Sequence, residues 1–479
     1  MFVLKWHLIF WIAALAARPT FAESPVELRV DFSMPAGSIR RLHGINKGPL
    51  AAGGLMEVTQ AVRALNVPFS RLHDCHWPNP DVVDIHAVFP DFQADPDAAA
   101  SYDFALTDEY LAVTRQTGAE IIYRLGESIE HTSKKRFVHP PKEAAKWAAI
   151  CLGIIRHYNE GWANGFHHRI RYWEIWNEPE NRPAMWTGSD EDYFQLYRVA
   201  ATAIKARFPD LKVGGPAVGA SGQFIKGEFC ATAFVTNFLG VCRRESLPLD
   251  FFSWHCYTAD PSELAVRARA IRRLLDAHGF TATESHLNEW NFLPGNTWKP
   301  LTRTSSPDIR QHFYEEMANA RGGAFIVAAL IELQDAPVDV CNLFHGEVGG
   351  FGLFTEHGVP QKNYHALRAF HRLLDTPRRV ETLGAIPGQL AFVAGLNASA
   401  TEAGALISNF SHPESDIRVT VARLPWSGRT IVETYIVDAA RNFDLIRSET
   451  NALSTADIRL RLKSPTVGLI RLRLATDIK

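Results

Sequence analysis

The sequence predicts an α/β fold: a parallel (β/α)8 TIM barrel followed by a C-terminal antiparallel β-sandwich. Between residues 45 and 374, short apolar stretches alternate with helical patterns eight times, which is the repeat of a closed parallel barrel. After Thr376 the helical patterns stop and short alternating stretches follow, as in antiparallel sheets with one wet face. The chain has no G-x-G-x-x-G or Walker motif, which disfavours the alternative of a doubly wound open sheet.

The predicted barrel elements alternate along the chain. Strands are predicted at 42–46, 69–74, 120–126, 171–176, 211–216, 251–257, 283–290 and 324–333. Helices are predicted at 55–65, 108–117, 141–158, 189–208, 262–278, 307–322 and 363–374. Ser189 and Asp192 have the spacing of a capping box at the start of the 189–208 helix.

The chain divides into four predicted segments. Residues 1–22 are typical of a secretory signal peptide, with Lys5, an apolar stretch too short to span a bilayer, and Thr20-Phe21-Ala22 as the cleavage site. Residues 23–40 form a strand that we expect to join the β-sandwich, because a closed barrel has no free edge. The barrel covers 41–375 and the β-sandwich 376–479. We therefore expect a secreted or periplasmic protein that no membrane segment anchors after cleavage.

Charge, cysteine content and histidine spacing argue against a nucleic-acid partner, a disulfide framework and a metal site. The formal net charge is −2, which disfavours nucleic acid as a partner. Six cysteines are too few for a disulfide framework in a chain of 479 residues, although a bridge between Cys230 and Cys242 stays open. His73 and His76 lack the further ligands of a tetrahedral site. We predict no metal and no cofactor.

Two glutamates end predicted strands of this barrel. Glu178 follows strand four in Trp176-Asn177-Glu178-Pro179, and Glu289 ends strand seven in Asn288-Glu289-Trp290-Asn291. Strands four and seven lie on opposite sides of the barrel mouth, so these carboxyl groups face each other. Glycoside cleavage needs such a pair, one carboxyl as proton donor and the other as nucleophile or base. Taken singly, a glutamate such as Glu178 is more often a surface carboxylate than a catalytic group; the pairing with Glu289 favours the catalytic interpretation.

These motifs resemble the retaining glycosidases with catalytic glutamates on strands four and seven of a (β/α)8 barrel. Within them the chain is most similar to glycoside hydrolase family 39, which contains β-xylosidases and α-L-iduronidases. Segments 102–104, 250–257 and 350–354 carry the more specific part of the similarity. The resemblance implies that Glu178 is the acid/base and Glu289 the nucleophile. On this basis we expect a raised pKa for Glu178, a low one for Glu289 and a bell-shaped pH profile.

The resemblance also implies a set of substrate-binding residues. His73, Asn177 and His255 are expected to hydrogen-bond sugar hydroxyls. Tyr257 is expected to steady the nucleophile and Trp290 to form an apolar wall of the pocket, and Asp335 is expected to be either a sugar contact or a loop cap.

The expected function is a β-xylosidase-like exo-enzyme acting on an oligo- or polysaccharide. Alternatives are an endo-acting exopolysaccharide hydrolase, an L-arabinosidase or a β-glucosidase, and a carbohydrate-binding barrel without turnover. The chain departs from the family pattern after strand two, at Asp74-Cys75, and after strand eight, where Glu347-Val348 interrupts a Gly-rich run. The sugar, the linkage and the oligomeric state stay open because these loops choose the substrate.

Overall fold

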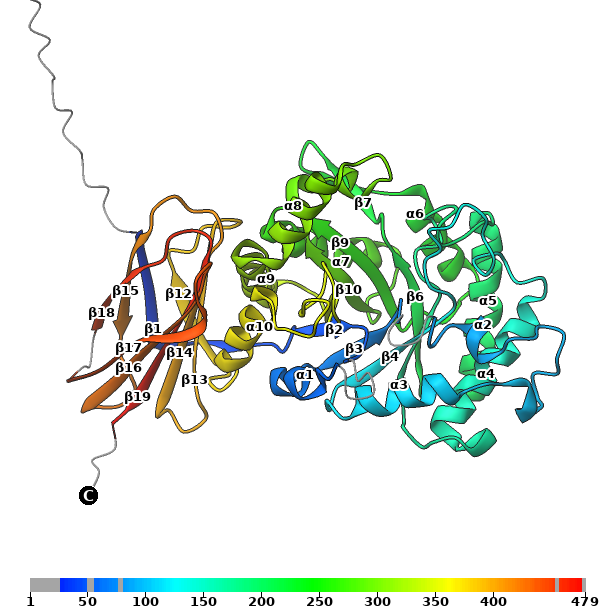
Figure 1. Ribbon diagram of the computed structural model, residues 1–479, viewed down its shortest axis with the longest axis horizontal. Helices are drawn as coiled ribbons and strands as arrows, with labels where there is room; N and C mark the ends of the chain where they lie inside the picture. Colours follow the sequence, from blue (N-terminus) through cyan, green and yellow to red (C-terminus); the bar gives the residue numbers. More distant parts are fainter. Residues whose placement is uncertain (1–25, 50–55, 76–80, 453–455, 476–479) are drawn as a thin grey trace, which may run out of the picture.

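The computed structural model describes residues 26–49, 56–75, 81–452 and 456–475, arranged as a barrel and a β domain (Figure 1). The predicted signal peptide at 1–22 lies outside the described residues. In the part of the chain that is described, no helix has the length and apolar run needed to cross a membrane.

Eight parallel strands close into the predicted barrel. β11 pairs with β2 and so completes the ring. In barrel order the strands are β2 (Gly44–Asn46), β3 (Phe69–Leu72), β4 (Glu120–Leu125), β5 (Tyr172–Ile175), β6 (Lys212–Val218), β9 (Phe251–Thr258), β10 (Glu284–Phe292) and β11 (Val340–Leu343). The carboxyl ends of all eight therefore meet at one mouth.

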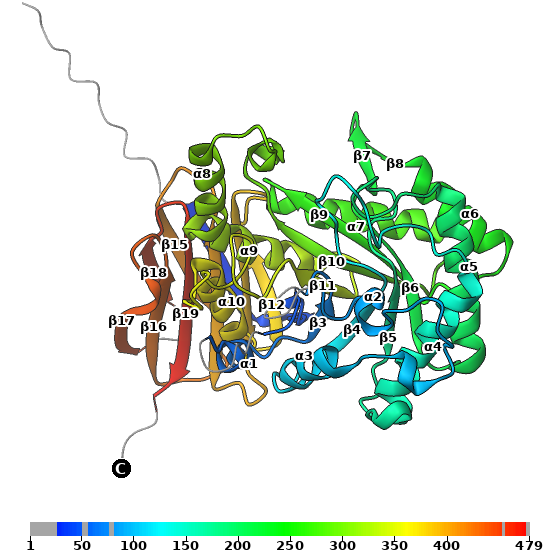
Figure 2. The same cartoon turned by 45° about the vertical axis from the view of Figure 1, so that its right-hand side comes forward.

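Helices surround the barrel, and short elements decorate its loops. The Ser189 capping box is present at the start of α5, as predicted. The helices are α1 (Thr59–Leu65), α2 (Ile85–Val88), α3 (Ala105–Arg115), α4 (Ala144–Glu160), α5 (Asp190–Arg207), α6 (Ala233–Arg244), α7 (Pro261–Ala277), α8 (Pro307–Ala318), α9 (Ala320–Glu332) and α10 (Lys362–Leu373). The loop after β6 carries a hairpin, β7 (Gly222–Ile225) and β8 (Glu228–Ala231), which projects from the barrel (Figure 2).

The eighth strand is β11 and not the predicted 324–333 stretch, which lies within helix α9. The prediction was wrong because α9 is buried almost all round, so its sequence has no polar face to reveal a helical period. α9 packs between the barrel helices and the β domain (Figure 1). The Ser408 hydroxyl of the β domain donates to the Ala324 carbonyl at 2.7 Å.

The β domain is one curled sheet of nine strands in the order β17-β16-β19-β14-β13-β12-β1-β15-β18. β1 (Val26–Ser38) pairs antiparallel with β12 and parallel with β15, so the sheet is mixed and differs in this detail from the expected sandwich. Its other strands are β12 (Arg378–Leu383), β13 (Leu390–Leu396), β14 (Glu402–Asn409), β15 (Asp416–Ala422), β16 (Arg429–Val437), β17 (Asn442–Ala452), β18 (Ala456–Arg461) and β19 (Thr466–Leu474).

The six cysteines are all free thiols. Cys230 lies exposed on the β7–β8 hairpin and Cys242 is buried in α6. The disulfide that the sequence left open is therefore absent between these two described residues.

Candidate active site

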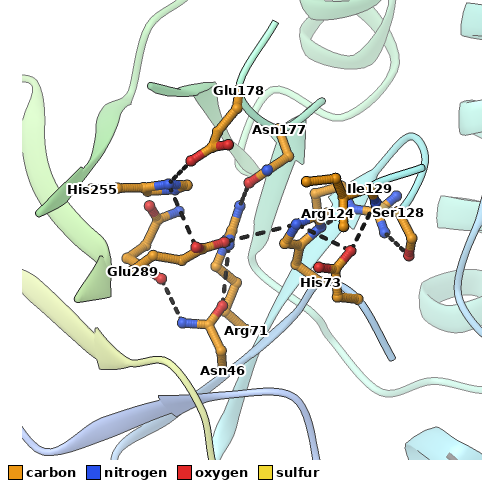
Figure 3. A network of polar contacts seen from close by, with 12 residues as sticks. Asn46, Arg71, His73, Arg124, Ser128, Ile129, Asn177, Glu178, His255 and Glu289 are labelled. Atoms are coloured by element: carbon orange, nitrogen blue, oxygen red, sulfur yellow. Dashed lines mark hydrogen bonds and ion pairs between the residues drawn. The ribbon is translucent and has the colours of Figure 1, made fainter. Parts of the chain in front are cut away.

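A buried arginine at the end of β3 organises the polar groups at the barrel mouth (Figure 3). Nη1 of Arg71 donates to Oε1 of Glu289 at 2.8 Å, and Nη2 donates to Oδ1 of Asn177 at 2.7 Å. Its Nε donates to Glu174 at 2.7 Å. Arg71 therefore joins the ends of β5 and β10, the two strands that carry the predicted catalytic glutamates.

Glu289 is held from two sides. Besides the bond from Arg71, the Tyr257 hydroxyl donates to Oε2 of Glu289 at 2.7 Å. The amide of the preceding Asn288 also points into the barrel, where it donates to Glu174. Two neighbouring strand residues can face the same way only where the strand bulges, and β10 shifts register between Leu287 and Glu289.

The loop after β5 presents Glu178 to the opposite side of the mouth. β5 ends at Ile175, and both Trp176 and Glu178 take positive φ, at 69° and 44°. The amide of Glu178 donates to the Ala217 carbonyl at 3.0 Å, which fixes this unusual backbone. Gly219 leaves space for the side chain, because a Cβ there would lie 2.4 Å from Oε1 of Glu178.

The two carboxyl groups lie close together across the mouth. An oxygen of Glu178, an oxygen of Glu289 and a ring nitrogen of His255 all lie within 4.8 Å of one another. Nδ1 of His255 is 2.8 Å from Oε1 of Glu178 and 3.6 Å from Oε2 of Glu289. This close approach agrees with the separation of about 5–5.5 Å in retaining glycosidases and is shorter than the roughly 6.5–9.5 Å that inverting enzymes need for a water.

Burial and charge shift the pKa values of this trio. Burial alone would raise the pKa of Glu178, but the hydrogen bond and charge of His255 outweigh it and bring that pKa below its ordinary value. Burial raises the pKa of Glu289, although His255 and Arg71 oppose the rise. For His255 itself, burial lowers the pKa and the two carboxylates more than compensate, so it lies above its ordinary value.

The unliganded site therefore reverses the expected order of the two glutamate pKa values. The cause is His255, which the sequence analysis treated only as a sugar contact. The two groups are in contact and titrate together, so the protonation of Glu178 depends on that of His255.

His73 completes the inner site beside Glu289. Its Nε2 lies 3.8 Å from Oε1 of Glu289 and 3.3 Å from Asp74, while Nε of Arg124 donates to its Nδ1 at 3.2 Å. Burial, followed by the charges of Arg124 and Arg71, holds the pKa of His73 well below its usual value. The ring is therefore neutral at neutral pH.

Residues 74–382 match the protein family described as glycosyl hydrolases family 39. The match takes in more than half of the 479 residues. The chain belongs to glycoside hydrolase family 39.

Named relatives share part of the family 39 sequence or its fold. A β-xylosidase from Geobacillus stearothermophilus is 28% identical over an alignment of 267 positions that covers 50% of this chain and 48% of the relative. The match thus spans about half the length of that curated relative. A glucosidase structure from Croceicoccus marinus has a TM-score of 0.78 at 25% identity, covering 95% of this chain and 100% of that one. A GH39 enzyme from Xanthomonas axonopodis pv. citri has a TM-score of 0.72 at 17% identity, covering 94% and 98% of the two chains; this likeness shows the fold.

Six of the eight predicted site residues come together in this family 39 barrel: His73, Asn177, Glu178, His255, Tyr257 and Glu289. The structure does not place the other two with them. Trp290 is fully buried in the main apolar core, because the strand residue after the inward-facing Glu289 points outward. Trp290 therefore has no surface to offer a sugar.

Asp335 lies away from the mouth. It precedes β11, so it sits at the amino end of that strand. Both its oxygens accept from Arg379 of β12 at 2.6 Å. The prediction failed because the eighth strand had been assigned to α9, which moved Asp335 to the wrong end of the barrel.

Sequence reasoning missed the buried charges beneath the glutamates. Arg71 and Glu174 have no exposed side-chain surface and pair with each other, and Asn46 accepts from Arg71 at 3.1 Å. The available signal was a charged residue in the middle of an otherwise apolar strand, because such a charge must find a buried partner.

Glu347 is another buried charged residue near the mouth that sequence reasoning missed. It belongs to the interruption after strand eight and is buried beside the mouth. The Tyr110 hydroxyl donates to its Oε1 at 2.7 Å, and Nζ of Lys47 lies 3.7 Å from its Oε2. Burial raises the pKa of Glu347 to about 7, against the opposing effects of Lys47 and Tyr110.

Another cluster, Asp84, His86 and Glu127, also has ligand atoms within 4.8 Å of one another. Asp84 accepts from Arg124 and from Ser128, and Nδ1 of His86 contacts Glu127. These contacts account for the cluster as an ion-pair network around Arg124. The expectation that the protein uses no metal stays a prediction.

Proposed function

We propose that the protein is a retaining glycoside hydrolase that releases single β-linked sugars, with β-xylosides as the first candidate substrates. Glu178 is the acid/base and Glu289 the nucleophile. The observation that carries this proposal is the pair of carboxyl groups within 4.8 Å across the mouth. Arg71 and Tyr257 contact Glu289, whereas His255 contacts Glu178. These different surroundings suit two different roles.

The proposed reaction has two displacements. Glu289 attacks the anomeric carbon while the bond to the leaving oxygen breaks, and Glu178 gives that oxygen its proton. Glu178 then takes a proton from water, the resulting hydroxide attacks the anomeric carbon, and Glu289 is released. Two inversions at one carbon retain the anomeric configuration.

The neighbouring residues bind and orient the reacting sugar in this proposal. Arg71 occupies Oδ1 of Asn177, so the Asn177 amide nitrogen remains to donate to a hydroxyl. His73 is neutral and offers Nε2 beside Glu289. His255 governs the proton of Glu178, in addition to the sugar contact that the resemblance implied.

A hydrogen bond across the mouth supports action at chain ends. The Arg303 guanidinium donates to the His131 carbonyl at 3.1 Å. Arg303 lies in the loop after β10 and His131 in the loop after β4, and these strands are opposite in the barrel. A polysaccharide lying across the open mouth would meet this connection, which favours binding of a chain end.

The choice of sugar rests on the named relatives. The β-xylosidase from Geobacillus stearothermophilus supports xylosides. The glucosidase from Croceicoccus marinus supports glucosides as the second candidate.

We also propose that the protein is secreted or exported to the periplasm, because residues 1–22 are typical of a signal peptide. Mass spectrometry of the exported protein should show cleavage after Ala22.

A screen of 4-nitrophenyl glycosides tests the enzyme assignment. The wild type should hydrolyse the β-xyloside or the β-glucoside, and NMR of the first product should show the β anomer. Glu289→Gln should abolish turnover. Glu178→Gln should lower kcat/KM by about 10²–10⁴-fold for poor leaving groups.

The same screen separates the alternatives. Xylohexaose should release xylose from the start, whereas early release of longer fragments would identify an endo-enzyme. Binding of xylo-oligosaccharides with no hydrolysis by the wild type would identify a carbohydrate-binding barrel. An α anomer as first product would contradict the role of Glu289.

A further inference from the structure

An exposed tryptophan lies beside the aromatic residue that holds the nucleophile. Trp298 follows β10 and 46% of its surface is exposed. Its ring lies edge-on to Tyr257 at a centroid distance of 5.0 Å and nearly parallel to Phe351 at 6.2 Å. Because Tyr257 donates to Glu289, a single aromatic ring separates the Trp298 indole from the nucleophile.

The loop that carries Trp298 is fixed to the end of β9. The Leu293 amide donates to the Thr258 carbonyl at 2.9 Å, and Asn296 accepts from the Ala259 amide. The indole is therefore positioned before any ligand arrives, which is what a binding platform needs. By contrast, Trp176 and Trp186 pack against each other and are buried.

The two walls of the mouth differ in chemistry. The wall after β2, β3 and β11 is charged and buried, with Lys47, His73, Asp74 and Glu347, and suits sugar hydroxyls. The wall after β9 and β10 is aromatic and partly exposed. His255, on the same β9 as Tyr257, contacts Glu178, the acid that would protonate the leaving oxygen. His255 also lies 3.6 Å from Glu289, and Tyr257 contacts Glu289 directly. The aromatic wall therefore borders both carboxyl groups, between which the bond to the leaving group breaks.

We propose that Trp298 is a stacking platform for the ring of the leaving group, a sugar residue or an aryl group bound next to the reacting sugar. This inference rests on the proposed glycoside hydrolase function. The apolar face of a pyranose or aryl ring would cover the exposed indole and remove both surfaces from water. Trp298 would then select for leaving groups that contain a ring.

The test compares two β-xylosides that differ in the leaving group. 4-Nitrophenyl β-D-xyloside has a ring, and 2,2,2-trifluoroethyl β-D-xyloside has an activated leaving group without one. Trp298→Ala should lower kcat/KM about 3–10-fold for the aryl substrate and less than twofold for the trifluoroethyl substrate. Trp298→Phe should recover part of the loss. The corresponding glucosides serve if the wild type prefers glucose.

Two further readouts isolate the platform. The first readout is kcat of Trp298→Ala for 2,4-dinitrophenyl β-D-xyloside. Removal of the glycosyl group from Glu289 takes place after the leaving group has gone. Where this step limits turnover, kcat of the variant should equal that of the wild type. Ile446→Ala removes an equally exposed apolar side chain from the β domain, 47% exposed, and should leave both substrates unaffected. Thermal unfolding checks that each variant is folded.

Three outcomes have distinct meanings. Equal losses for both substrates would show that Trp298 acts through Tyr257 and Glu289, and would overturn the platform. No loss for the aryl substrate would overturn it as well. If the wild type hydrolyses none of the four xylosides and glucosides that carry nitrophenyl or trifluoroethyl groups, the proposed function fails and not the platform alone.

Discussion

Nδ1 of His255 lies 2.8 Å from Oε1 of Glu178. A carboxylate can only accept at this distance, so the two groups share one proton when Glu178 is ionised. The pKa of Glu178 is lowered and that of His255 is raised. In the proposed reaction His255 starts as the doubly protonated imidazolium. Its Nδ1 proton passes to Glu178 as Glu178 protonates the leaving oxygen, and a neutral imidazole remains.

Replacing His255 should move the basic limb of the pH profile. In the wild type the shared proton is lost as pH rises through the raised pKa of His255, above its ordinary value of 6.5. In His255→Asn the proton rests on Glu178 alone, so we expect the basic limb of kcat/KM to move to lower pH. A basic limb that stays in place would show that Glu178 holds its proton without the imidazole.

Replacing Tyr257 should move the acid limb. Its hydrogen bond favours the ionised form of Glu289, and Glu289 must be ionised to attack. Tyr257→Phe should raise the pKa of Glu289 further, so activity should be lost at higher pH on the acid side. Loss of a bond to a charged group costs about 1.5–3 kcal/mol, or roughly 10–100-fold in kcat/KM. An acid limb that is unchanged would contradict this role.

A methyl group at Gly219 should disable Glu178 without unfolding the protein. The added Cβ would lie 2.4 Å from Oε1 of Glu178, so the carboxyl group must move away from His255. We expect Gly219→Ala to lower kcat/KM by at least tenfold, with little change in the thermal midpoint. Gly240→Ala is the control, since a Cβ there meets nothing within 4 Å. Full activity of Gly219→Ala would argue against the position assigned to Glu178.

Arg71 should matter for stability as well as for activity. Arg71→Gln leaves Glu174 buried without its charged partner, which costs about 3–5 kcal/mol. Arg171→Gln breaks the half-exposed pair with Glu120 and should cost at most ~1 kcal/mol. Urea denaturation of both variants measures the difference. Similar midpoints for the two would show that the buried network is not a source of stability.

The sequence was most informative where a strand ended in a chemically distinctive tip. Glu178 and Glu289 were found because the alternation of strands and helices placed them on strands four and seven. That count was correct for both, since only the eighth strand was wrong. The α9 segment was predicted as a strand because a helix buried on all sides has the composition of a buried strand. Asp335, which follows α9, was therefore assigned to the wrong end of the barrel.

Contacts between distant segments could not be predicted. Arg71 lies 103 residues from Glu174 and 218 from Glu289, and no local pattern connects them. The reversal of the glutamate pKa values likewise depends on where the His255 ring points, which the barrel and not the motif decides. The exposure of Trp298 and the burial of Trp290 also follow from packing alone.

The most direct test of the central claim is to trap the glycosyl-enzyme. A 2-deoxy-2-fluoro-β-D-xyloside with a 2,4-dinitrophenyl leaving group should inactivate the enzyme and add one fluoroxylosyl mass to the protein; the 2-fluoroglucoside replaces it if the wild type prefers glucose. We predict that peptide mass spectrometry will find the label on Glu289, and that Glu289→Gln will take up none. A label on another residue, or no covalent label on an enzyme that hydrolyses the parent sugar, would contradict the double-displacement mechanism proposed for Glu289.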